Sequence, residues 1–530
     1  MNSRSRPASE TFGLLMILLV FTSLGAALRL RYVIPANFPI NDGGMFLQMT
    51  RDLQAAGFKL PIYTTYNQDT YTSPIPFAYA PLGFYIAGLL QSLSGLDLAV
   101  IFQYLPAVFA ILTIPAFFLL ARELLGPGFA AFNAVLAYIA LLPAYMWLIM
   151  GGGITRSPAT FFSLLALWLA VRAFKRRSWA AAAFAALCTG LVGLTHLEIL
   201  WITAIWITLA AVILAPNRWG LLALAAIGAG SALILAPWFL ATAGRHGLQT
   251  ILGALRSGNF SLAGSLINLL LRNLTDEVTF TPLLVFAMLA FVQRLLRRDY
   301  LVPAWVLAVA FLNPRSLPRS MSIPLALLVG VAIEEIIIPA LTRSSLDERR
   351  SRFVANLAAT ILVAFMVIRS AALSPLFMQV ETNSLDPLSQ ENRQAMAWTA
   401  AKTPADSRFL VLTPATNWSS DQPAEWFPAL AGRPSLNTAQ GAEWLPAGVF
   451  DRQVALHEAL TACTGQDDLQ CLDDAAAQYN LAYDYIMISG QLLDSGRSYL
   501  LPMPIETALR ASPAFAPVYE NGQVAIFQRK

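Results

Sequence analysis

The sequence predicts a polytopic α-helical membrane protein with about eleven spans, followed by a C-terminal extracytoplasmic α/β domain. Of the 530 residues, 57% are hydrophobic and only 12% are charged, whereas soluble chains carry about 25% charged residues. Apolar runs of about 20 residues, long enough to cross a bilayer, recur over residues 1–376. The charge then changes sign: 26 basic and 14 acidic side chains precede residue 377, and 9 basic and 17 acidic ones follow.

These observations divide the chain into a transmembrane domain, 1–376, and a soluble domain, 377–530. The transmembrane domain has two long outer loops, 31–98 and 243–279. Its basic excess is typical of loops that orient a membrane protein, so it does not indicate a nucleic-acid partner. The predicted spans lie near 11–30, 99–121, 128–147, 157–174, 178–196, 197–215, 218–241, 280–296, 300–313, 317–341 and 353–372.

The orientation follows from the basic clusters at 175–177, 294–298 and 343–352, because cytoplasmic loops hold the excess of Lys and Arg. An even number of spans separates these clusters from one another. The N-terminus is therefore predicted to be cytoplasmic and the C-terminal domain to lie outside. The apolar stretch 75–93 would break this parity if it crossed the membrane. Its prolines and tyrosines favour an interfacial or re-entrant helix.

The first outer loop contains Asp42 within the sequence Phe-Pro-Ile-Asn-Asp-Gly-Gly. A proline and two glycines bracket this acid, so the backbone can turn tightly around it. We therefore expect the Asp42 carboxylate to lie at the membrane surface. The second outer loop has apolar residues at helical spacing, which fits either a surface-lying lid over a lipid-facing cavity or a structural connector.

Two arginines, Arg315 and Arg319, meet the outer edge of a predicted span. Arginine at this depth can bind a lipid phosphate through paired hydrogen bonds, although headgroup snorkelling gives the same pattern. The two prolines in the same loop, Pro314 and Pro318, favour phosphate binding because they hold the arginines in a fixed loop.

A third outer feature is the turn that contains His196 and Glu198. The two side chains, two residues apart, could share a divalent metal or position a nucleophile with Asp42 across the cavity. The alternative is a polar pair that stabilises a tight turn between helices. No other cofactor is indicated.

The soluble domain contains two buried strands near 408–412 and 485–488, each preceded by a helical stretch, which predicts a βαβ arrangement. An Asn-Gly turn within 517–527 predicts a terminal hairpin. Cys463 and Cys471 would form a disulfide in an oxidising exterior. Because this domain lacks catalytic motifs, it is expected to assist recognition while the membrane part performs the chemistry.

With these features the chain resembles the C-type glycosyltransferase superfamily, and within it the protein-mannosyltransferase, aminoarabinose-transferase and oligosaccharyltransferase group. The resemblance rests on the first span with its Asp42 loop, the Tyr-Ala-Pro-Leu-Gly-Phe-Tyr segment at 79–85, the Ala-Arg-Glu-Leu-Leu-Gly segment at 121–126, the turn at 194–198, and the Glu-Trp-Phe-Pro-Ala-Leu segment at 425–430. It covers nearly the whole chain, but its motifs are short.

The resemblance implies an inverting membrane glycosyltransferase that moves a sugar from a polyprenyl-phosphate donor to an acceptor at the outer face of the cell membrane. It implies that Asp42 is the catalytic acid of the first outer loop, with Arg315 and Arg319 at the donor phosphate. Many members have two adjacent acids, whereas this chain has Asn41-Asp42, so Asp52 or Glu198 are candidates for the second acid. The acceptor is open among protein, lipid and glycan.

Two alternatives remain at this stage. A secondary transporter would also have many spans with few charges, but transporters place their charges near the middle of the membrane. A non-catalytic envelope assembly protein would use its tail to bind a partner. It would have no need for Asp42 to lie near Arg315 and Arg319.

Overall fold

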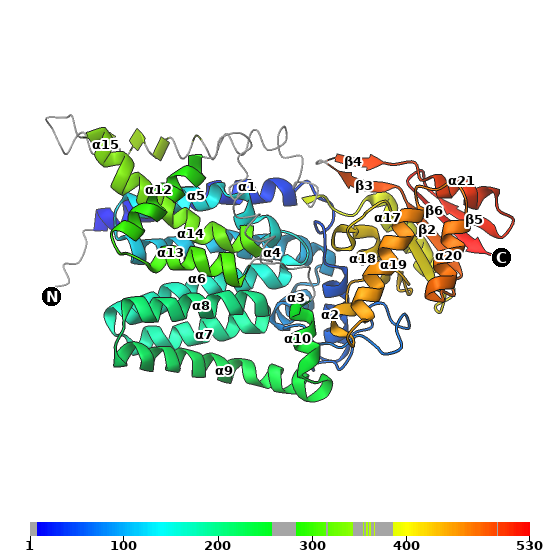
Figure 1. Cartoon of the computed structure of the whole chain (residues 1–530), viewed down its shortest axis with the longest axis horizontal. Helices are drawn as coiled ribbons and strands as arrows, with labels where there is room; N and C mark the ends of the chain where they lie inside the picture. The colour runs from blue at the N-terminus through cyan, green and yellow to red at the C-terminus, as the bar shows by residue number, and fades with distance from the viewer. Residues whose placement is uncertain are drawn as a thin grey trace.

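The computed structural model describes residues 8–256, 282–313, 316–342, 385–494 and 497–530, together with 353–354, 357–358, 360–361 and 365. Figure 1 shows two parts along the long axis of the molecule, which we call the helical block (the described residues up to 365) and the tail domain (residues 385–530). The short helices α2, α3 and α10 lie where the two parts meet.

The helical block contains the apolar helices. Most of these helices begin or end near a loop that the sequence predicts. Their bounds are α1 Ala8–Val33, α2 Gly44–Ala55, α3 Leu82–Ser94, α4 Leu98–Leu125, α5 Phe129–Ala140, η1 Leu142–Ala144, η2 Met146–Leu148, α6 Gly153–Arg176, α7 Trp179–Thr195, α8 Leu197–Leu214, α9 Arg218–His246, α10 Leu248–Arg256, α12 Pro282–Leu296, α13 Leu301–Leu312, α14 Leu317–Ala332, the π-helical turn η4 Ile333–Ile337 and α15 Ile338–Thr342.

Within the described residues, six helices are long and apolar enough to cross a membrane, namely Phe12–Val33, Leu98–Leu125, Gly153–Arg176, Leu197–Leu214, Arg218–His246 and Leu317–Ala340. A seventh span is obtained if Phe129–Ala140 and Leu142–Leu148, which meet at 87°, are counted as one bent element. Three of the other predicted spans appear as shorter apolar helices, α7, α12 and α13. The predicted span 353–372 lies largely outside the described residues. Length and composition thus support six or seven of the roughly eleven predicted spans.

The apolar stretch 75–93, which would break the predicted parity of spans if it crossed the membrane, contains most of the short helix α3. Its 13 residues extend about 20 Å at 1.5 Å per residue, which is less than the roughly 30 Å of a bilayer's hydrocarbon core. It packs against α2 and α4, so it lies in the junction between the helical block and the tail domain. Of the amphipathic outer loop, α10 is described, and 257–279 lies outside the described residues.

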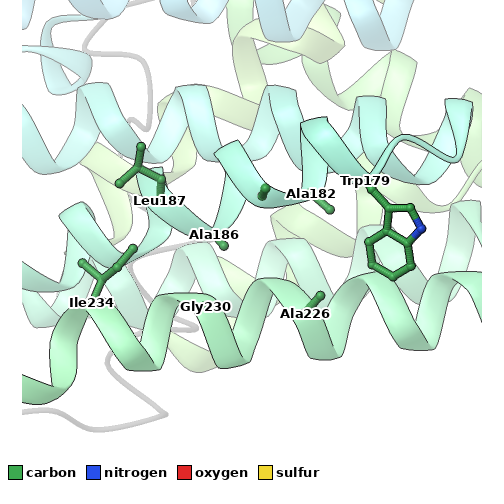
Figure 2. A pocket seen from close by; sticks show the side chains of 8 residues that line it. Trp179, Ala182, Ala186, Leu187, Ala226, Gly230 and Ile234 are labelled. Atoms are coloured by element: carbon green, nitrogen blue, oxygen red, sulfur yellow. The ribbon is translucent and has the colours of Figure 1, made fainter.

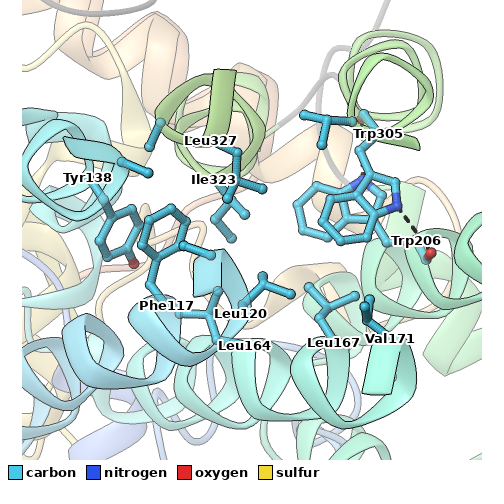
Figure 3. Close-up of a cluster of buried hydrophobic side chains, with 14 of the residues drawn as sticks. Phe117, Leu120, Tyr138, Leu164, Leu167, Val171, Trp206, Trp305, Ile323 and Leu327 are labelled. Atoms are coloured by element: carbon cyan, nitrogen blue, oxygen red, sulfur yellow. Dashed lines mark hydrogen bonds between the residues drawn. The ribbon is translucent and has the colours of Figure 1, made fainter. Parts of the chain in front are cut away.

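Stacked aromatic side chains stabilise the packing of the helical block. The indole rings of Trp206 on α8 and Trp305 on α13 stack with centroids 5.5 Å apart, and each Nε1 donates a hydrogen bond to the other residue's carbonyl oxygen. Phe117 and Tyr138 stack in the same cluster at 4.4 Å (Figure 3). Because the indole N–H groups are satisfied within the pair, both tryptophans can be fully buried without an unpaired donor.

An apolar groove of about 290 Å³ lies along the contact between α7 and α9 (Figure 2). Alanines, Gly230 and larger apolar side chains line it, with Trp179 at one end. Small residues let the two helix backbones approach closely, as is common between membrane helices. The groove has no charged side chain in its lining, so it does not supply the reacting groups.

The tail domain is a sheet covered by helices on both faces. Its bounds are α17 Gln390–Lys402, β1 Phe409–Leu412, η6 Trp418–Ser420, α18 Gln422–Ala431, η7 Ala442–Trp444, α19 Val449–Cys463, α20 Gln470–Tyr479, β2 Tyr485–Ser489, β3 Gln491–Asp494, β4 Arg497–Leu500, α21 Pro504–Ala511, β5 Phe515–Glu520 and β6 Val524–Arg529. The strand order is β1-β2-β6-β5, with β1 and β2 parallel and the other neighbours antiparallel, and β3 pairs with β4 separately. The predicted parallel pair and terminal hairpin are both confirmed.

Strand alternation gives the sheet two different faces. Phe409 and Val411 on β1 pack into one cluster with α17, α18 and α2, whereas Leu410 and Leu412 pack into another with α19, α20 and α21. The first cluster joins the tail domain to the helical block. Cys463 at the end of α19 and Cys471 on α20 form a disulfide.

Candidate functional site

Asp42 lies in the turn between α1 and α2, at the end of the helical block that faces the tail domain. Its Oδ2 accepts a hydrogen bond from Arg156 Nη2 at 2.8 Å, and its Oδ1 accepts one from the backbone N–H of Gly152 at 2.9 Å. Gly152 is the residue before the first turn of α6. The positive end of that helix therefore faces the carboxylate.

Gly152 allows this close approach because it has no side chain. A Cβ at this position would lie 2.4 Å from Asp42 Oδ2, and a Cβ on Gly151 would lie 2.0 Å from the Asp42 carbonyl oxygen. Any other residue at either position would push the Asp42 turn away from α6. The run of three glycines at 151–153 is thus explained by the contact with Asp42 and, for Gly153, with Leu148.

Arg156, on the first turn of α6, is the counterion of Asp42. The exposed fractions of the Arg156 and Asp42 side chains are 17% and 21%, so water screens the pair little. The guanidinium also lies over the ring of Trp147, 5.6 Å from its centroid. Its buried Nη1 has no hydrogen-bond partner among the described residues, so this cation retains a free donor.

A second ion pair lies at the same end of the block. Arg319 on α14 donates a hydrogen bond to Glu198 Oε1 on α8 at 3.3 Å and another to Ser316 Oγ at 3.0 Å. Arg156 is within electrostatic range of Glu198. The Asp42–Arg156 pair and the Glu198–Arg319 pair are therefore related by the electrostatic interaction of Arg156 with Glu198, and the convergence of Asp42 with Arg319 stays a prediction. Arg315 lies outside the described residues.

Tyr79 interacts electrostatically with members of both ion pairs. Its hydroxyl is 3.4 Å from Thr155 Oγ1, and its charge environment includes Arg156, Glu198 and Asp42. Burial raises the pKa of Tyr79, while Arg156 acts in the opposite direction. The phenol is therefore neutral at physiological pH and offers an O–H group at the centre of the site.

His196 packs edge-on against Tyr79, with ring centroids 6.1 Å apart, and is 8% exposed. Within the described residues, no group of three or more His, Cys, Asp or Glu side chains has a geometry that fits a metal ion. Asp42 and Glu198 each face an arginine instead, which is the pattern of ion pairs. This donor set does not fit a divalent cation. The metal therefore stays a prediction.

Of the proposed second acids, Asp52 is engaged in holding a loop. Its carboxylate accepts hydrogen bonds from Thr64 Oγ1 at 2.6 Å and from Thr65 N and Oγ1 at 2.9 and 2.6 Å. Gln48 Nε2 adds a fourth at 3.1 Å. Since Asp52 lies eight residues past the start of α2, it is displaced by about 12 Å along that helix.

The carboxyl that does lie beside Asp42 is Glu425, on α18 of the tail domain. Its Oε1 accepts hydrogen bonds from the backbone N–H groups of Gly43 and Met45, both at 3.2 Å. Burial and then the neighbouring Asp42 charge raise the pKa of Glu425 to about 8. The tail domain was predicted only to assist recognition, whereas one of its side chains directly contacts the Asp42 turn.

Sequence reasoning missed Arg156 and Glu425 as site residues. A lone arginine three residues after a glycine triplet, at the start of an apolar helix, is a local signal that points to Arg156. The predicted topology also puts it on the same side as Asp42. Glu425 begins one of the segments that carry the family resemblance, but 383 residues separate it from Asp42, and only folding reveals that the two are neighbours.

The chain has the fold of solved membrane glycosyltransferases, as the predicted resemblance implies, and its apolar helices make it a multi-pass membrane protein. The archaeal oligosaccharyltransferase AglB from Archaeoglobus fulgidus, in complex with an inhibitory peptide and a dolichol-phosphate, matches with a TM-score of 0.58 and 13% identity over 91% of this chain and 70% of its own.

Two further solved structures match at similar levels. ArnT from Cupriavidus metallidurans in the apo state has a TM-score of 0.54 and 11% identity, and the match covers 98% of both chains. The arabinofuranosyltransferase AftD from Mycobacteria has a TM-score of 0.51 and 16% identity over 97% of this chain and 40% of its own. No family model matches the chain, and no curated protein does so.

Proposed function

We propose that this protein is an inverting glycosyltransferase that moves a sugar from a polyprenyl-phosphate donor to an acceptor at the outer face of the membrane. The observation that carries the proposal is the Asp42–Arg156 ion pair, 2.8 Å long, at the junction of the membrane helices and the tail domain. Structures with this fold include AglB with a dolichol-phosphate and ArnT bound to undecaprenyl phosphate.

Asp42 is the general base in this proposal. The acceptor hydroxyl gives its proton to the Asp42 carboxylate as the acceptor oxygen bonds to the anomeric carbon and the bond from that carbon to the phosphate oxygen breaks. With an amide acceptor, Asp42 orients the nitrogen instead. Attack opposite the leaving phosphate inverts the anomeric carbon. Arg156 keeps the Asp42 carboxylate oriented before the acceptor arrives.

Arg319 binds the donor phosphate, and Arg315 joins it. As the bond to the sugar breaks, negative charge develops on the leaving polyprenyl phosphate, and a guanidinium fixed beside it stabilises that charge. Glu198, paired with Arg319 at 3.3 Å, occupies the guanidinium until the donor phosphate takes its place. Of the outer loop 243–279, predicted as a lid over the lipid, the structure describes α10 and the residues up to 256.

The orientation belongs to the same proposal: the N-terminus is cytoplasmic and the tail domain is extracytoplasmic. The helix α6 runs from Arg156 beside Asp42 to the basic residues Lys175 and Arg176. The basic cluster is therefore one helix length away from the tail domain. Cytoplasmic loops hold the excess of basic residues, which puts the Asp42 site on the opposite side. Enzyme-reporter fusions to the C-terminus that are active only outside the cytoplasm test this orientation.

The test is sugar transfer in membranes supplied with a panel of labelled polyprenyl-phosphate sugars. Asp42→Asn keeps the size of the side chain and one acceptor oxygen for Gly152 or Arg156, but it removes the base, so we expect transfer to fall at least about a hundredfold. Asp69→Asn is the matched control: it makes the same change in the same loop, at an exposed position whose φ of 64° asparagine tolerates.

Three results would contradict parts of the proposal. Equal transfer by wild type and Asp42→Asn would remove Asp42 from catalysis and direct attention to Glu198. Loss of transfer in Asp69→Asn as well would assign the effect to the fold of the loop. No transfer from any donor, with the protein folded, would favour a transporter or an assembly protein.

A further inference from the structure

We infer that Glu425 of the tail domain is the positioning residue for Asp42: its carboxyl holds the backbone of the Asp42 turn, and its charge state is coupled to that of Asp42. This inference rests on the proposed function for its catalytic consequence. Its structural part, that the tail domain fixes the geometry of the Asp42 turn, can be tested without any activity.

The hydrogen bonds around the turn come largely from the tail domain. Glu425 Oε1 accepts from the N–H groups of Gly43 and Met45, the residues that flank the start of α2. Trp426 Nε1 donates to the Asn41 carbonyl oxygen at 2.7 Å, and the N–H of Asn41 donates to the Asp386 carbonyl at 3.0 Å. The residues on both sides of Asp42 are thus bound to the tail domain.

Glu425 also occupies the N-terminus of α2, where backbone N–H groups have no partner within the helix. No side chain from the turn itself caps α2. The carboxyl of Glu425 replaces that cap from another domain, in the position where helix ends favour a carboxylate oxygen. Losing it would leave the first turn of α2 unsatisfied and free the Asp42 turn.

The contact is too close to tolerate a side chain in the turn. A Cβ on Gly44 would lie 2.8 Å from the Glu425 carbonyl oxygen and 3.0 Å from Trp426 Cα. Tyr66 holds the same carbonyl from the other side with a 2.6 Å hydrogen bond. The backbone of α18 is therefore fixed against α2, and the Glu425 side chain has little room to move.

The charged and titratable groups that face Glu425 are few. Asp42 faces it from the α1–α2 turn, with Arg156 of α6 behind Asp42, and Tyr66 faces it from the loop before α3. Glu425 is 5% exposed, and its second oxygen, Oε2, has no hydrogen-bond partner among the described residues. An ionised Glu425 would add a second buried negative charge beside Asp42, which is costly in this environment.

The neutral form of Glu425 therefore fits the site. Its Oε1 accepts the two backbone N–H hydrogen bonds, and the negative charge stays on Asp42. Arg156 then forms its ion pair with Asp42 alone. As the pH rises through about 8, the pKa to which burial and Asp42 raise Glu425, ionisation sets the two carboxylates against each other and loosens the turn.

The experiment compares Glu425→Gln, Glu425→Ala and the control Glu458→Gln, an exposed glutamate on α19, in the full-length protein. Amide hydrogen exchange of the peptide that contains 41–46 is the first readout. We expect Glu425→Ala to speed exchange about tenfold or more, because two hydrogen bonds are lost. Glu425→Gln keeps an acceptor oxygen and should remain within about twofold of wild type at pH 7.

The second readout is the pH profile of both exchange and sugar transfer. Wild-type transfer should fall as the pH rises above about 8, with exchange at 41–46 rising beyond its intrinsic increase. Glu425→Gln cannot ionise, so both changes should be absent from that variant. Glu425→Ala should lower the maximal rate rather than the donor KM, since Asp42 is misplaced while the phosphate site is intact.

Unchanged exchange in Glu425→Ala would overturn the positioning role. A Glu425→Gln profile that matches wild type, or a Glu425→Gln protein that exchanges as fast as Glu425→Ala, would overturn the charge coupling. If wild type transfers no sugar, the proposed function fails while the exchange data still decide the role of Glu425.

Discussion

The two ends of the helical block use the same side chains for different purposes. At the end that faces the tail domain, the ion pairs Asp42–Arg156 and Glu198–Arg319 have side chains that are 10 to 21% exposed. At the far end, Glu123 pairs with Arg176, and Glu335 pairs with Arg294 and Arg297; the two outermost arginines are 55 and 56% exposed. Solvated pairs of this kind contribute about 0–1 kcal/mol each.

This difference in exposure indicates which ion pairs serve the chemistry. At the far end, Arg176 and Arg297 are more than half exposed, so water screens their pairs with Glu123 and Glu335, whereas Arg294 is 19% exposed. The pairs near the tail domain lie in a poorly screened environment, where breaking one leaves an uncompensated charge that costs far more. Charge is retained there, so matched substitutions at the two ends should separate function from anchoring.

The largest effect is expected from Arg156→Met. Asp42 would lose its counterion and its orientation, so we expect transfer to fall about a hundredfold or more. Arg176→Met, which removes the partner of Glu123 at the far end, should change transfer less than about threefold, because that pair is solvated. Initial rates in membranes at equal protein levels measure both. Equal losses in the two variants would contradict the proposed contrast.

Gly152→Ala is expected to have an intermediate effect. Its Cβ would lie 2.4 Å from Asp42 Oδ2, so the carboxylate must move, and we expect a loss of about tenfold to a hundredfold in maximal rate. The matched control is Gly128→Ala, which also changes the residue before a helix but whose Cβ meets only Glu334 Oε1 at 3.9 Å. A loss of activity in Gly128→Ala as large as in Gly152→Ala would show that the effect is on folding.

The smallest effect, and the sharpest in sign, is expected at Glu198. If Arg319 binds the donor phosphate, Glu198→Gln removes a competing carboxylate and should lower the donor KM by a few fold, while Arg319→Lys should raise it by about tenfold through loss of the planar fork. Glu335→Gln at the far end should leave the donor KM unchanged. Steady-state rates against donor concentration give these values. A donor KM that moves in the same direction for Glu198→Gln and Arg319→Lys would exclude phosphate binding at Arg319.

Much of the fold follows from local patterns. Apolar length predicted the helices that cross the block, and the parity of the basic clusters, with the prolines and tyrosines of the stretch 75–93, predicted an interfacial or re-entrant helix there. Alternation and an Asn-Gly turn predicted the paired strands and hairpin of the tail domain. Each of these depends on residues close together in the chain, where burial preference and backbone geometry act over a few positions.

The candidate site was only partly accessible in this way. Asp42, Glu198 and Arg319 were recognisable as charges next to apolar spans, because the cost of burying a charge makes such positions rare. Their pairing was not recognisable: Arg319 was expected to face a phosphate and also contacts Glu198, and the second acid for Asp42 was expected to be Asp52 or Glu198. A contact between side chains depends on how helices pack, which hydropathy does not encode.

The sequence by itself determined that this chain spans a membrane, that a soluble α/β domain follows, and that an acid lies in the turn after the first span. Only the tertiary structure decided that Arg156 is the counterion of this acid and that Glu425, from the tail domain, holds the turn in place. The physical reason is that composition and periodicity report which surfaces must be buried, whereas the partner of a buried charge is fixed by close packing between segments hundreds of residues apart.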